Sequence, residues 1–294
     1  MLDDRSQIKA FVIEFKNMLH IPISFEFFPP KTEATAEVML ASATDLRRLN
    51  PEFVTVTCGA CGSPKTGTFE AASRLKNELG FITGVHISYF GTKKADLFEY
   101  AETLWGAGIH HLVALRGDIP EGVNIADYNH GDYFQFTSDF VEALMACRPF
   151  DISVGAYPEK HPDAPDMTAD IKALKLKCGA GAKRAITQFF FGTDIYKGFL
   201  EQVRGAGIET PIVPGLLPIA DFEKAKAFAV KCGATIHPAI AERFLNSSDP
   251  QQTAIDLLAS QIDDLINLNV PQLHFYTLNR ADLILSAFQK LGKI

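Results

Sequence analysis

The chain has 294 residues, of which 47% are hydrophobic, and this supply of apolar side chains suits one large domain or two small ones, with a buried core. Its formal net charge of −7 is spread along the sequence without an acidic or basic block, so we expect no non-specific binding to nucleic acid. No apolar run approaches the roughly 20 residues that cross a bilayer, and the first residues lack the basic start and apolar centre of a signal peptide, so we expect a cytoplasmic protein without a membrane partner.

The cysteines indicate a reducing compartment. They are Cys58, Cys61, Cys147, Cys178 and Cys232, an odd number in a long chain, which favours reduced thiols. Cys58 and Cys61 have the spacing of a metal or redox pair. A zinc site would need a second pair of ligands, and no other Cys-x-x-Cys or His-x-x-x-His occurs. We therefore favour incidental thiols and expect no metal site, with redox and metal roles as the alternatives.

Short apolar runs alternate with helical patterns along the chain. Residues 5–19 carry apolar side chains at helical spacing and predict an N-terminal helix packed on the body of the protein. The runs that we interpret as strands are residues 23–28, 53–57, 84–88, 111–116, 152–157, 185–190, 212–215 and 273–277. The helical patterns cover residues 34–49, 69–79, 94–105, 136–146, 168–178, 194–206, 221–231, 238–268 (a pair) and 280–290.

This alternation predicts an α/β fold, a single (β/α)8 TIM barrel, because most of the runs are continuously apolar, as in strands buried on both faces. We expect one catalytic domain over residues 1–294, with residues 1–20 as an extra N-terminal helix. An open doubly wound sheet is the main alternative. It would normally place a glycine-rich phosphate turn after the first strand, whereas Pro29 and Pro30 follow the first run here and no G-x-G-x-x-G follows any run.

Two carboxylates lie at the ends of predicted strands, where a barrel carries its active site. Glu26 and Asp118 are therefore candidate catalytic residues. Because Phe25 and Phe27 flank Glu26, we expect desolvation to raise the pKa of Glu26 and to keep its carboxyl protonated near neutral pH, as a general acid requires. The alternative is a carboxylate tied to a backbone or arginine partner. Asp118 follows Gly117, which would let a ligand approach the backbone, and its alternative role is a helix N-cap or turn.

Further polar candidates follow the later runs. Residues 157–162 form a polar, aromatic loop, and Asp170 and Lys177 share one face of the next helix. This surface could hold a nucleotide, although a solvated helix face is the favoured interpretation for Asp170 and Lys177. Gln188 lies in an apolar run and needs partners, either a heterocycle with mixed donors and acceptors or an internal hydrogen bond. Arg280 could meet an anionic substrate tail or form a salt bridge across the barrel rim.

Six motifs occur in order along the chain. They are residues 24–30 (SFEFFPP), 114–118 (ALRGD), 156–159 (AYPE), 184–191 (RAITQFFF), 214–218 (PGLLP) and 274–280 (HFYTLNR). Together they closely resemble the methylenetetrahydrofolate reductases of the short bacterial type, from about residue 23 to the C-terminus. The resemblance implies a flavin-containing β/α barrel. In that family, reduced nicotinamide passes a hydride to FAD, which then reduces 5,10-methylenetetrahydrofolate to 5-methyltetrahydrofolate for methionine synthesis.

The resemblance also implies roles for individual residues. Glu26 would be the acid that promotes opening of the methylene bridge, and Asp118 would lie near both the flavin and the pterin. The implied FAD site consists of Thr57, Ala60, His86, Arg116, Gly117, Asp118, Tyr157, His161, Ala164, Asp170 and Lys177. Gln188 would hydrogen-bond the folate, Phe228 would stack on it, and Arg280 would bind its far end. We expect NADH rather than NADPH as the co-substrate, and a homo-oligomer (tetramer or dimer).

Two other functions were weighed against this one. A glycoside hydrolase could use Glu26 and Asp118 as paired carboxylates, but the single tryptophan, Trp105, lies in a helical pattern away from the strand ends. A non-enzymatic barrel that binds a partner and has lost flavin is the second alternative. The presence of Glu26, Asp118 and Gln188 argues against it, because a degenerate site would be expected to lose costly buried polar groups.

Overall fold

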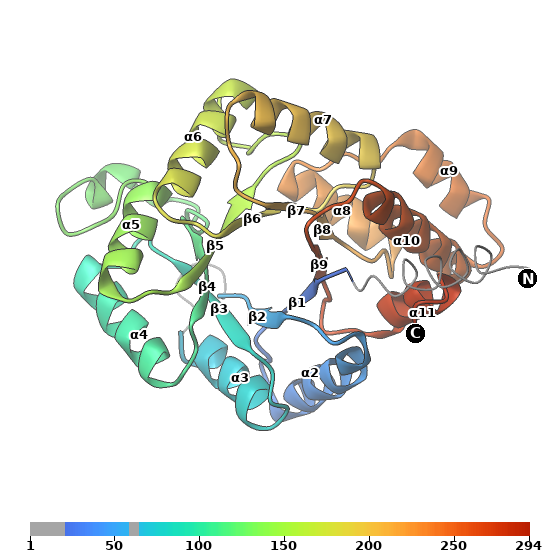
Figure 1. Cartoon of the computed structure of the whole chain (residues 1–294), viewed down its shortest axis with the longest axis horizontal. Helices are drawn as coiled ribbons and strands as arrows, with labels where there is room; N and C mark the ends of the chain where they lie inside the picture. Colours follow the sequence, from blue (N-terminus) through green and yellow to red (C-terminus); the bar gives the residue numbers. More distant parts are fainter. Residues whose placement is uncertain (1–20, 59–64) are drawn as a thin grey trace, which may run out of the picture.

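The computed structural model describes residues 21–58 and 65–294. Within this part, one sheet of parallel strands forms the centre of the molecule and the helices lie around its outside (Figure 1). The predicted helix at residues 5–19, together with Ala60 and Cys61, lies outside the described residues. No helix in the described part is both long and apolar enough to cross a membrane.

The strands are β1 (Ile23–Phe27), β2 (Phe53–Val56), β3 (Thr83–Ser88), β4 (His111–Leu115), β5 (Asp151–Ala156), β6 (Arg184–Thr187), β7 (Ile212–Val213), β8 (Gly215–Leu216) and β9 (Leu273–Tyr276). They lie in the order β7-β6-β5-β4-β3-β2-β1-β9-β8, and each neighbouring pair is parallel. The predicted parallel barrel is therefore confirmed, with each strand within a few residues of its expected position.

Pro214 divides the seventh predicted strand into β7 and β8. Proline has no N–H to donate to a sheet, but the carbonyl of Pro214 accepts a hydrogen bond from the N–H of His274 at 3.0 Å. β7 pairs with β6 on one side, and β8 pairs with β9 on the other. The ring of strands thus closes through this divided strand.

The helices of the described part are α2 (Glu33–Leu46), α3 (Lys65–Asn77), α4 (Lys94–Gly106), α5 (Thr137–Cys147), α6 (Met167–Gly179), α7 (Thr193–Gly205), α8 (Phe222–Cys232), α9 (Pro238–Leu245), α10 (Pro250–Asn267) and α11 (Asp282–Lys290). Local sequence signals mark the first turns of several of these helices. The side chains of Thr32, Asp166 and Asp221 accept hydrogen bonds from backbone N–H groups in the first turns of α2, α6 and α8. Pro238 and Pro250 occupy the first positions of α9 and α10, where a missing N–H has no cost.

Neighbouring residues of β1 face opposite sides of the sheet, because side chains alternate along a strand. Phe25 belongs to the apolar core between sheet and helices, where its ring lies 5.9 Å from that of Phe275. Phe275 packs in turn on Phe288 of α11. Glu26 faces the other way and contacts His86 of β3. Because β2 separates β1 from β3, this contact is made across the interior of the barrel.

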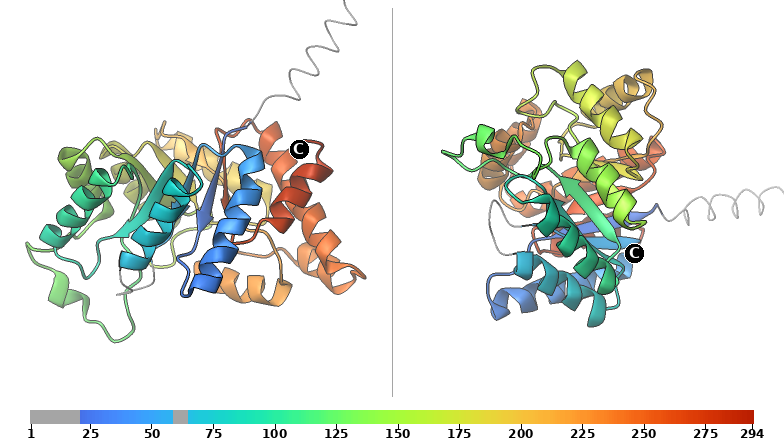
Figure 2. Two further views of the ribbon diagram at one scale, coloured as in Figure 1. Left: turned by 90° about the horizontal axis from the view of Figure 1, so that it is seen from below. Right: turned by 90° about the vertical axis from the view of Figure 1, so that its left-hand side faces the viewer.

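The carboxyl ends of the strands gather the long connecting segments. In the left view of Figure 2, the green segment after β4 and the helix α8 extend from the end of the barrel opposite to the C-terminus. The segment after β4 contains a short 3-10 helix, η2 (Ile125–Tyr128), that the sequence did not predict. β6 is shorter than expected and ends at Thr187. Phe189 and Phe190 are buried beyond the strand, against Phe228 and Tyr196 of helices α8 and α7, so their apolar character reflects packing under helices.

Candidate active site

A carboxyl group lies between two imidazoles inside the barrel, near the carboxyl ends of its strands. Glu26 of β1 places its Oε2 3.2 Å from Nε2 of His86 on β3 and 3.7 Å from Nε2 of His274 on β9. All three side chains are at least nine-tenths buried, and His274 is the deepest at 1% exposure. Neither Nε2 has an aligned hydrogen-bond partner among the described residues, so both contacts to the carboxyl are mainly electrostatic.

The expected raised pKa of Glu26 is wrong. Burial by itself raises the pKa of this carboxyl, but the adjacent His86 and His274 outweigh burial and lower it to about 2. Phe25 and Phe27 flank Glu26 in the sequence but do not surround its carboxyl. Their side chains lie in the core on the other side of the strand, so histidines from distant strands are the neighbours of Glu26. The carboxyl is therefore ionised near neutral pH in this structure.

Ser24 and His274 complete this polar group, and the sequence analysis gave neither of them a role. The two residues are register partners in the pairing of β1 with β9, and Ser24 Oγ lies 2.8 Å from Nδ1 of His274. The alternation of side chains could have identified them, since Ser24 lies two residues before Glu26 on the same face of β1. Burial lowers the pKa of His274, although Glu26 opposes this shift.

The motif after β4 forms the rim next to His86. Gly117 has a φ of +88°, and a Cβ there would lie 2.8 Å from Cβ of Ser88, so only glycine fits. The guanidinium of Arg116 donates to Asp163 Oδ2 at 2.6 Å and to the carbonyl of Gly117 at 3.2 Å. Arg116 thus ties this rim to the loop after β5. Asp118 is exposed at the same rim, where a ligand can reach its carboxylate.

The loop after β5 is held by its own polar groups. Lys160, with a φ of +78°, donates from Nζ to the carbonyls of His161, Pro162 and Ala164 at 2.9, 3.3 and 2.6 Å. The rings of Tyr157 and His161 meet edge to face, with 4.5 Å between their centroids. Burial, with Arg116 nearby, lowers the pKa of His161, so this imidazole is neutral at pH 7.

Asp170 and Lys177 do not form a solvated helix face, so that favoured interpretation is wrong. Asp170 is buried and accepts a hydrogen bond from the N–H of His161 at 2.8 Å. Lys177 donates from Nζ to the carbonyl of Gly155 at 2.6 Å. Burial lowers the pKa of Lys177, while Asp170 opposes this shift. Both residues support the strand and loop that carry Tyr157 and His161.

Gln188 and Phe228 both contact Phe189, in the segment after β6. Gln188 Oε1 accepts a hydrogen bond from the N–H of Phe189 at 3.0 Å, and Phe228 stacks on the ring of Phe189 with 5.1 Å between centroids. Gln188 also lines a pocket with Tyr157 and Cys232. The phenol of Tyr276 donates to the carbonyl of Thr187 at 2.6 Å.

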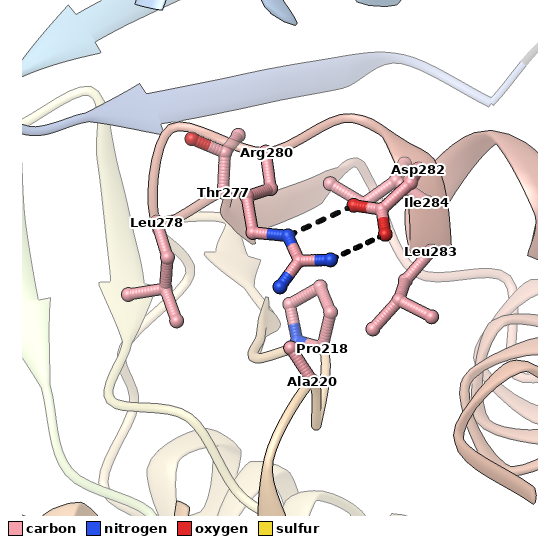
Figure 3. Close-up of a pocket in the computed structure, with 8 residues that line it drawn as sticks. All are labelled: Pro218, Ala220, Thr277, Leu278, Arg280, Asp282, Leu283 and Ile284. Carbon is pink, nitrogen blue, oxygen red and sulfur yellow. Dashed lines mark hydrogen bonds and ion pairs between the residues drawn. The ribbon is translucent and has the colours of Figure 1, made fainter. Parts of the chain in front are cut away.

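Arg280 lines a second pocket, which Figure 3 shows between the segment after β9 and the segment after β8. Its guanidinium donates to both carboxylate oxygens of Asp282, at 3.1 and 2.6 Å. Pro218 and Leu278 also line this pocket. Arg280 therefore has a salt bridge within its own segment, and not the salt bridge across the barrel rim that was one of the two alternatives. Glu26 lines neither pocket.

The remaining predicted positions lie around β2. Thr57 follows β2, donates its N–H to the carbonyl of Phe27 and accepts a hydrogen bond from Thr68. Burial raises the pKa of the Cys58 thiol, as expected for an incidental thiol. Ala60 and Cys61 are outside the described residues. Among the residues that the structure describes, no group of metal-binding side chains could hold an ion.

These positions define one end of the barrel with distinct chemical regions. A buried carboxyl with two imidazoles occupies the centre. Hydrogen-bond donors and an aromatic pair lie on the side of β4 and β5. An amide, stacked aromatic rings and a guanidinium lie on the side of β6 to β9. The arrangement can transfer a proton at its centre, with flat or anionic ligands on its two sides.

Comparison with known proteins shows what the whole chain is similar to. The sequence model of the methylenetetrahydrofolate reductase family matches residues 14–292. The 5,10-methylenetetrahydrofolate reductase of Escherichia coli (strain K12) is 37% identical over 276 residues, which cover 92% of this chain and 91% of that protein. Methylenetetrahydrofolate reductase (NADH) 1 of Arabidopsis thaliana is 31% identical and is covered over 48% of its length.

A solved structure with a similar fold is the dihydropteroate synthase (FolP) of Thermus thermophilus. Its TM-score is 0.50, and the similarity covers 92% of this chain and 94% of that one. At 14% identity the likeness extends to the fold alone. The sequence similarity goes further. Because a family model spans nearly the whole chain, and a relative aligns with it along nine-tenths of both lengths, the chain belongs to the methylenetetrahydrofolate reductase family.

Proposed function

We propose that this chain reduces 5,10-methylenetetrahydrofolate with a hydride that passes from reduced nicotinamide to FAD and then to the folate, so that the two substrates react in turn. The reductase activity itself follows from membership of the family. The flavin, the order of transfer and the residue roles are the proposal. The observation that carries them is the buried carboxyl of Glu26 between His86 and His274 at the barrel mouth.

Glu26 is the proposed acid. Opening of the methylene bridge requires a proton on the nitrogen that leaves the bridging carbon, and this leaves an iminium carbon that can accept hydride. Because Glu26 is ionised near neutral pH, it must receive a proton before it can give one. The imidazoles of His86 and His274 are the titratable groups in contact with it, so a proton source lies beside the acid.

The residues on the side of β4 and β5 suit FAD, whose hydride-carrying ring, ribitol and pyrophosphate need different partners. The guanidinium of Arg116 and the backbone N–H groups of the segment after β4 offer hydrogen-bond donors to an anion, and Gly117 leaves room for a ligand to approach the backbone closely. Tyr157 and His161 offer an aromatic surface. The proposed FAD site comprises Thr57, Ala60, His86, Arg116, Gly117, Asp118, Tyr157, His161, Ala164, Asp170 and Lys177. Asp170 and Lys177 would act chiefly by holding the backbone around Tyr157 and His161.

The side of β6 to β9 is the proposed folate site. Gln188 offers both a donor and an acceptor to the pterin, with Asp118 across the mouth. Phe228 is a half-exposed ring against which the middle of the folate can stack. Arg280 would bind a carboxylate of the folate tail, in place of or in addition to Asp282. NADH is the proposed hydride donor, in keeping with the name of the Arabidopsis relative.

Anaerobic stopped-flow spectroscopy of the flavin-loaded protein tests the proposal. Glu26→Gln should still be reduced by NADH, because that step needs no acid from the protein, whereas reoxidation by methylenetetrahydrofolate should slow about 100-fold or more. Glu78→Gln is a matched control, because Glu78 is a surface partner of Arg74 at 2.7 Å, and both of its half-reactions should match the wild type. Rapid folate reduction by Glu26→Gln would remove the acid role, and a protein that binds no flavin would remove the flavin mechanism.

A further inference from the structure

His274 has the position of a group that controls Glu26 without reaching a ligand. Its side chain is 1% exposed, compared with 9% for Glu26 and 9% for His86. It therefore lies behind the carboxyl as seen from the barrel mouth. Its Nδ1 lies 2.8 Å from Ser24 Oγ, while its Nε2, which has no hydrogen-bond partner among the described residues, faces Glu26 Oε2 at 3.7 Å. The sequence analysis assigned no role to this residue.

Ser24 lets His274 change its protonation state inside the barrel. A serine hydroxyl both donates and accepts hydrogen bonds. When the imidazole is neutral with its proton on Nε2, the hydroxyl can donate to Nδ1. When the imidazole is protonated on both nitrogens, the same hydroxyl can accept from Nδ1. His274 therefore keeps a partner on that side in either state, and the proton on Nε2 faces the carboxyl in both.

We propose that His274, held by Ser24, is a positioning residue that sets the protonation of Glu26, while His86 returns a proton to it in each turnover. This inference rests on the acid role proposed above for Glu26. In the step itself, Glu26 gives its proton to the departing nitrogen as the carbon–nitrogen bond of the bridge breaks. A proton then moves to the carboxylate from Nε2 of His86, the imidazole nearer the mouth, and that ring takes up a proton from solvent in return. No electrons are transferred in these proton movements.

Both histidines place Nε2 against the same carboxyl oxygen, Oε2. His86 is partly accessible at the mouth and can exchange protons there, while His274 is enclosed and acts on the carboxyl from behind. Other titratable or charged groups also face this pair. Arg184 of β6 disfavours the charged form of His274. The charge on Glu26 contributes to the raised pKa of Tyr276 of β9 and of Cys58 after β2. The groups that favour the ionised form of the Glu26 carboxyl are the imidazoles of His86 and His274.

The test uses His274→Gln in the flavin-loaded protein. Glutamine keeps an N–H near the carboxyl but cannot titrate. The first measurement is infrared spectroscopy across pH, in which the band of the protonated Glu26 carboxyl is assigned by its loss in Glu26→Gln. Removal of one of the two imidazoles that favour the ionised carboxyl should move the midpoint for appearance of this band upward by about one pH unit or more. His111→Gln is the matched control, because His111 is also a partly enclosed histidine but lies at the start of β4, beside Asp151.

The second measurement separates the half-reactions of the same variants. In His274→Gln the rate of flavin reduction by NADH and the KM for folate should match the wild type, because His274 touches neither ligand. The pH profile of the folate half-reaction should move in the same direction as the carboxyl band. Ser24→Ala, a smaller change, should move both in that direction by less. These results would support the inference.

Other results would overturn it. An unmoved band and an unmoved folate profile in Ser24→Ala, or in a folded His274→Gln, would show that His86 alone governs Glu26, provided that Glu26→Gln is impaired. The same shift in His111→Gln would show a general effect of removing histidine. Wild-type folate reduction by Glu26→Gln would instead refute the underlying acid role, which distinguishes the failure of the proposed function from the failure of this inference.

Discussion

The closure of the barrel depends on a glycine, and Gly215→Ala should break it. A Cβ at Gly215 would overlap the backbone carbonyl oxygen of Thr187 and would lie 2.6 Å from Cε2 of Tyr276. The backbone N–H of Gly215 also donates to Thr187 Oγ1 at 2.9 Å, and Tyr276 donates to the Thr187 carbonyl at 2.6 Å. Overpacking costs about 1–3 kcal/mol, and each strained hydrogen bond adds about 1 kcal/mol. We therefore expect a loss of about 3 kcal/mol.

Thermal and urea unfolding, followed by circular dichroism, measure this loss. Gly198→Ala is the matched control, because Gly198 lies within α7 and a Cβ there meets nothing within 4 Å. Alanine in a helix is favoured over glycine, so this control should gain about 0.5–1 kcal/mol. The two identical substitutions should thus have opposite signs. If Gly215→Ala unfolds at the wild-type midpoint, the tight contact between β6, β8 and β9 is not a constraint and the reasoning fails.

Two further predictions concern pH and the opposite end of the barrel. The pKa of Glu26 falls from 4.5 to about 2 on folding, so its stabilising contribution of roughly 3 kcal/mol is complete above pH 4.5 and is lost as the pH falls toward 2. The free energy of unfolding of Glu26→Gln should therefore depend less steeply on pH across this window, and a slope equal to that of the wild type would contradict the lowered pKa. Asp151→Asn should lower the free energy of unfolding by about 1–3 kcal/mol, since Arg184 donates to both carboxylate oxygens of Asp151, at 2.5 and 3.0 Å. A changed rate of folate reduction would contradict the placement of this ion pair at the amino ends of β5 and β6.

Most of the fold could be predicted because its signals are local. Continuous apolar runs indicated buried parallel strands, and the predicted ranges 94–105 and 136–146 lie close to α4 and α5. The errors arose where a contact distant in sequence decided the outcome. The predicted strand over residues 185–190 ends at Thr187, since Phe189 is buried by Phe228 of α8 instead of by a neighbouring strand. Hydrophobicity alone does not distinguish these two kinds of burial.

The prediction of the candidate site was limited in the same way, by contacts between residues that are distant in the sequence. Motif order brought Arg116, Gly117 and Tyr157 to one rim, because the carboxyl ends of parallel strands meet at one end of a barrel. The solvated face expected for Asp170 and Lys177 was wrong, because helical periodicity says which residues share a face but not what covers that face. For Arg280 the sequence allowed an anionic substrate tail or a salt bridge across the barrel rim, whereas the structure provides a salt bridge to the nearby Asp282.

The sequence by itself determined the alternation of strands and helices, the family resemblance and the position of Glu26 at a strand end, because each depends on residue types at short spacing. Only the tertiary structure decided the charge of that carboxyl. Ser24 and His274 are 250 residues apart along the chain, yet they are partners in adjacent strands, and His86 reaches Glu26 across the barrel. The pKa of a buried group depends on the charges that surround it in space, and that arrangement exists only once the ring of strands has closed.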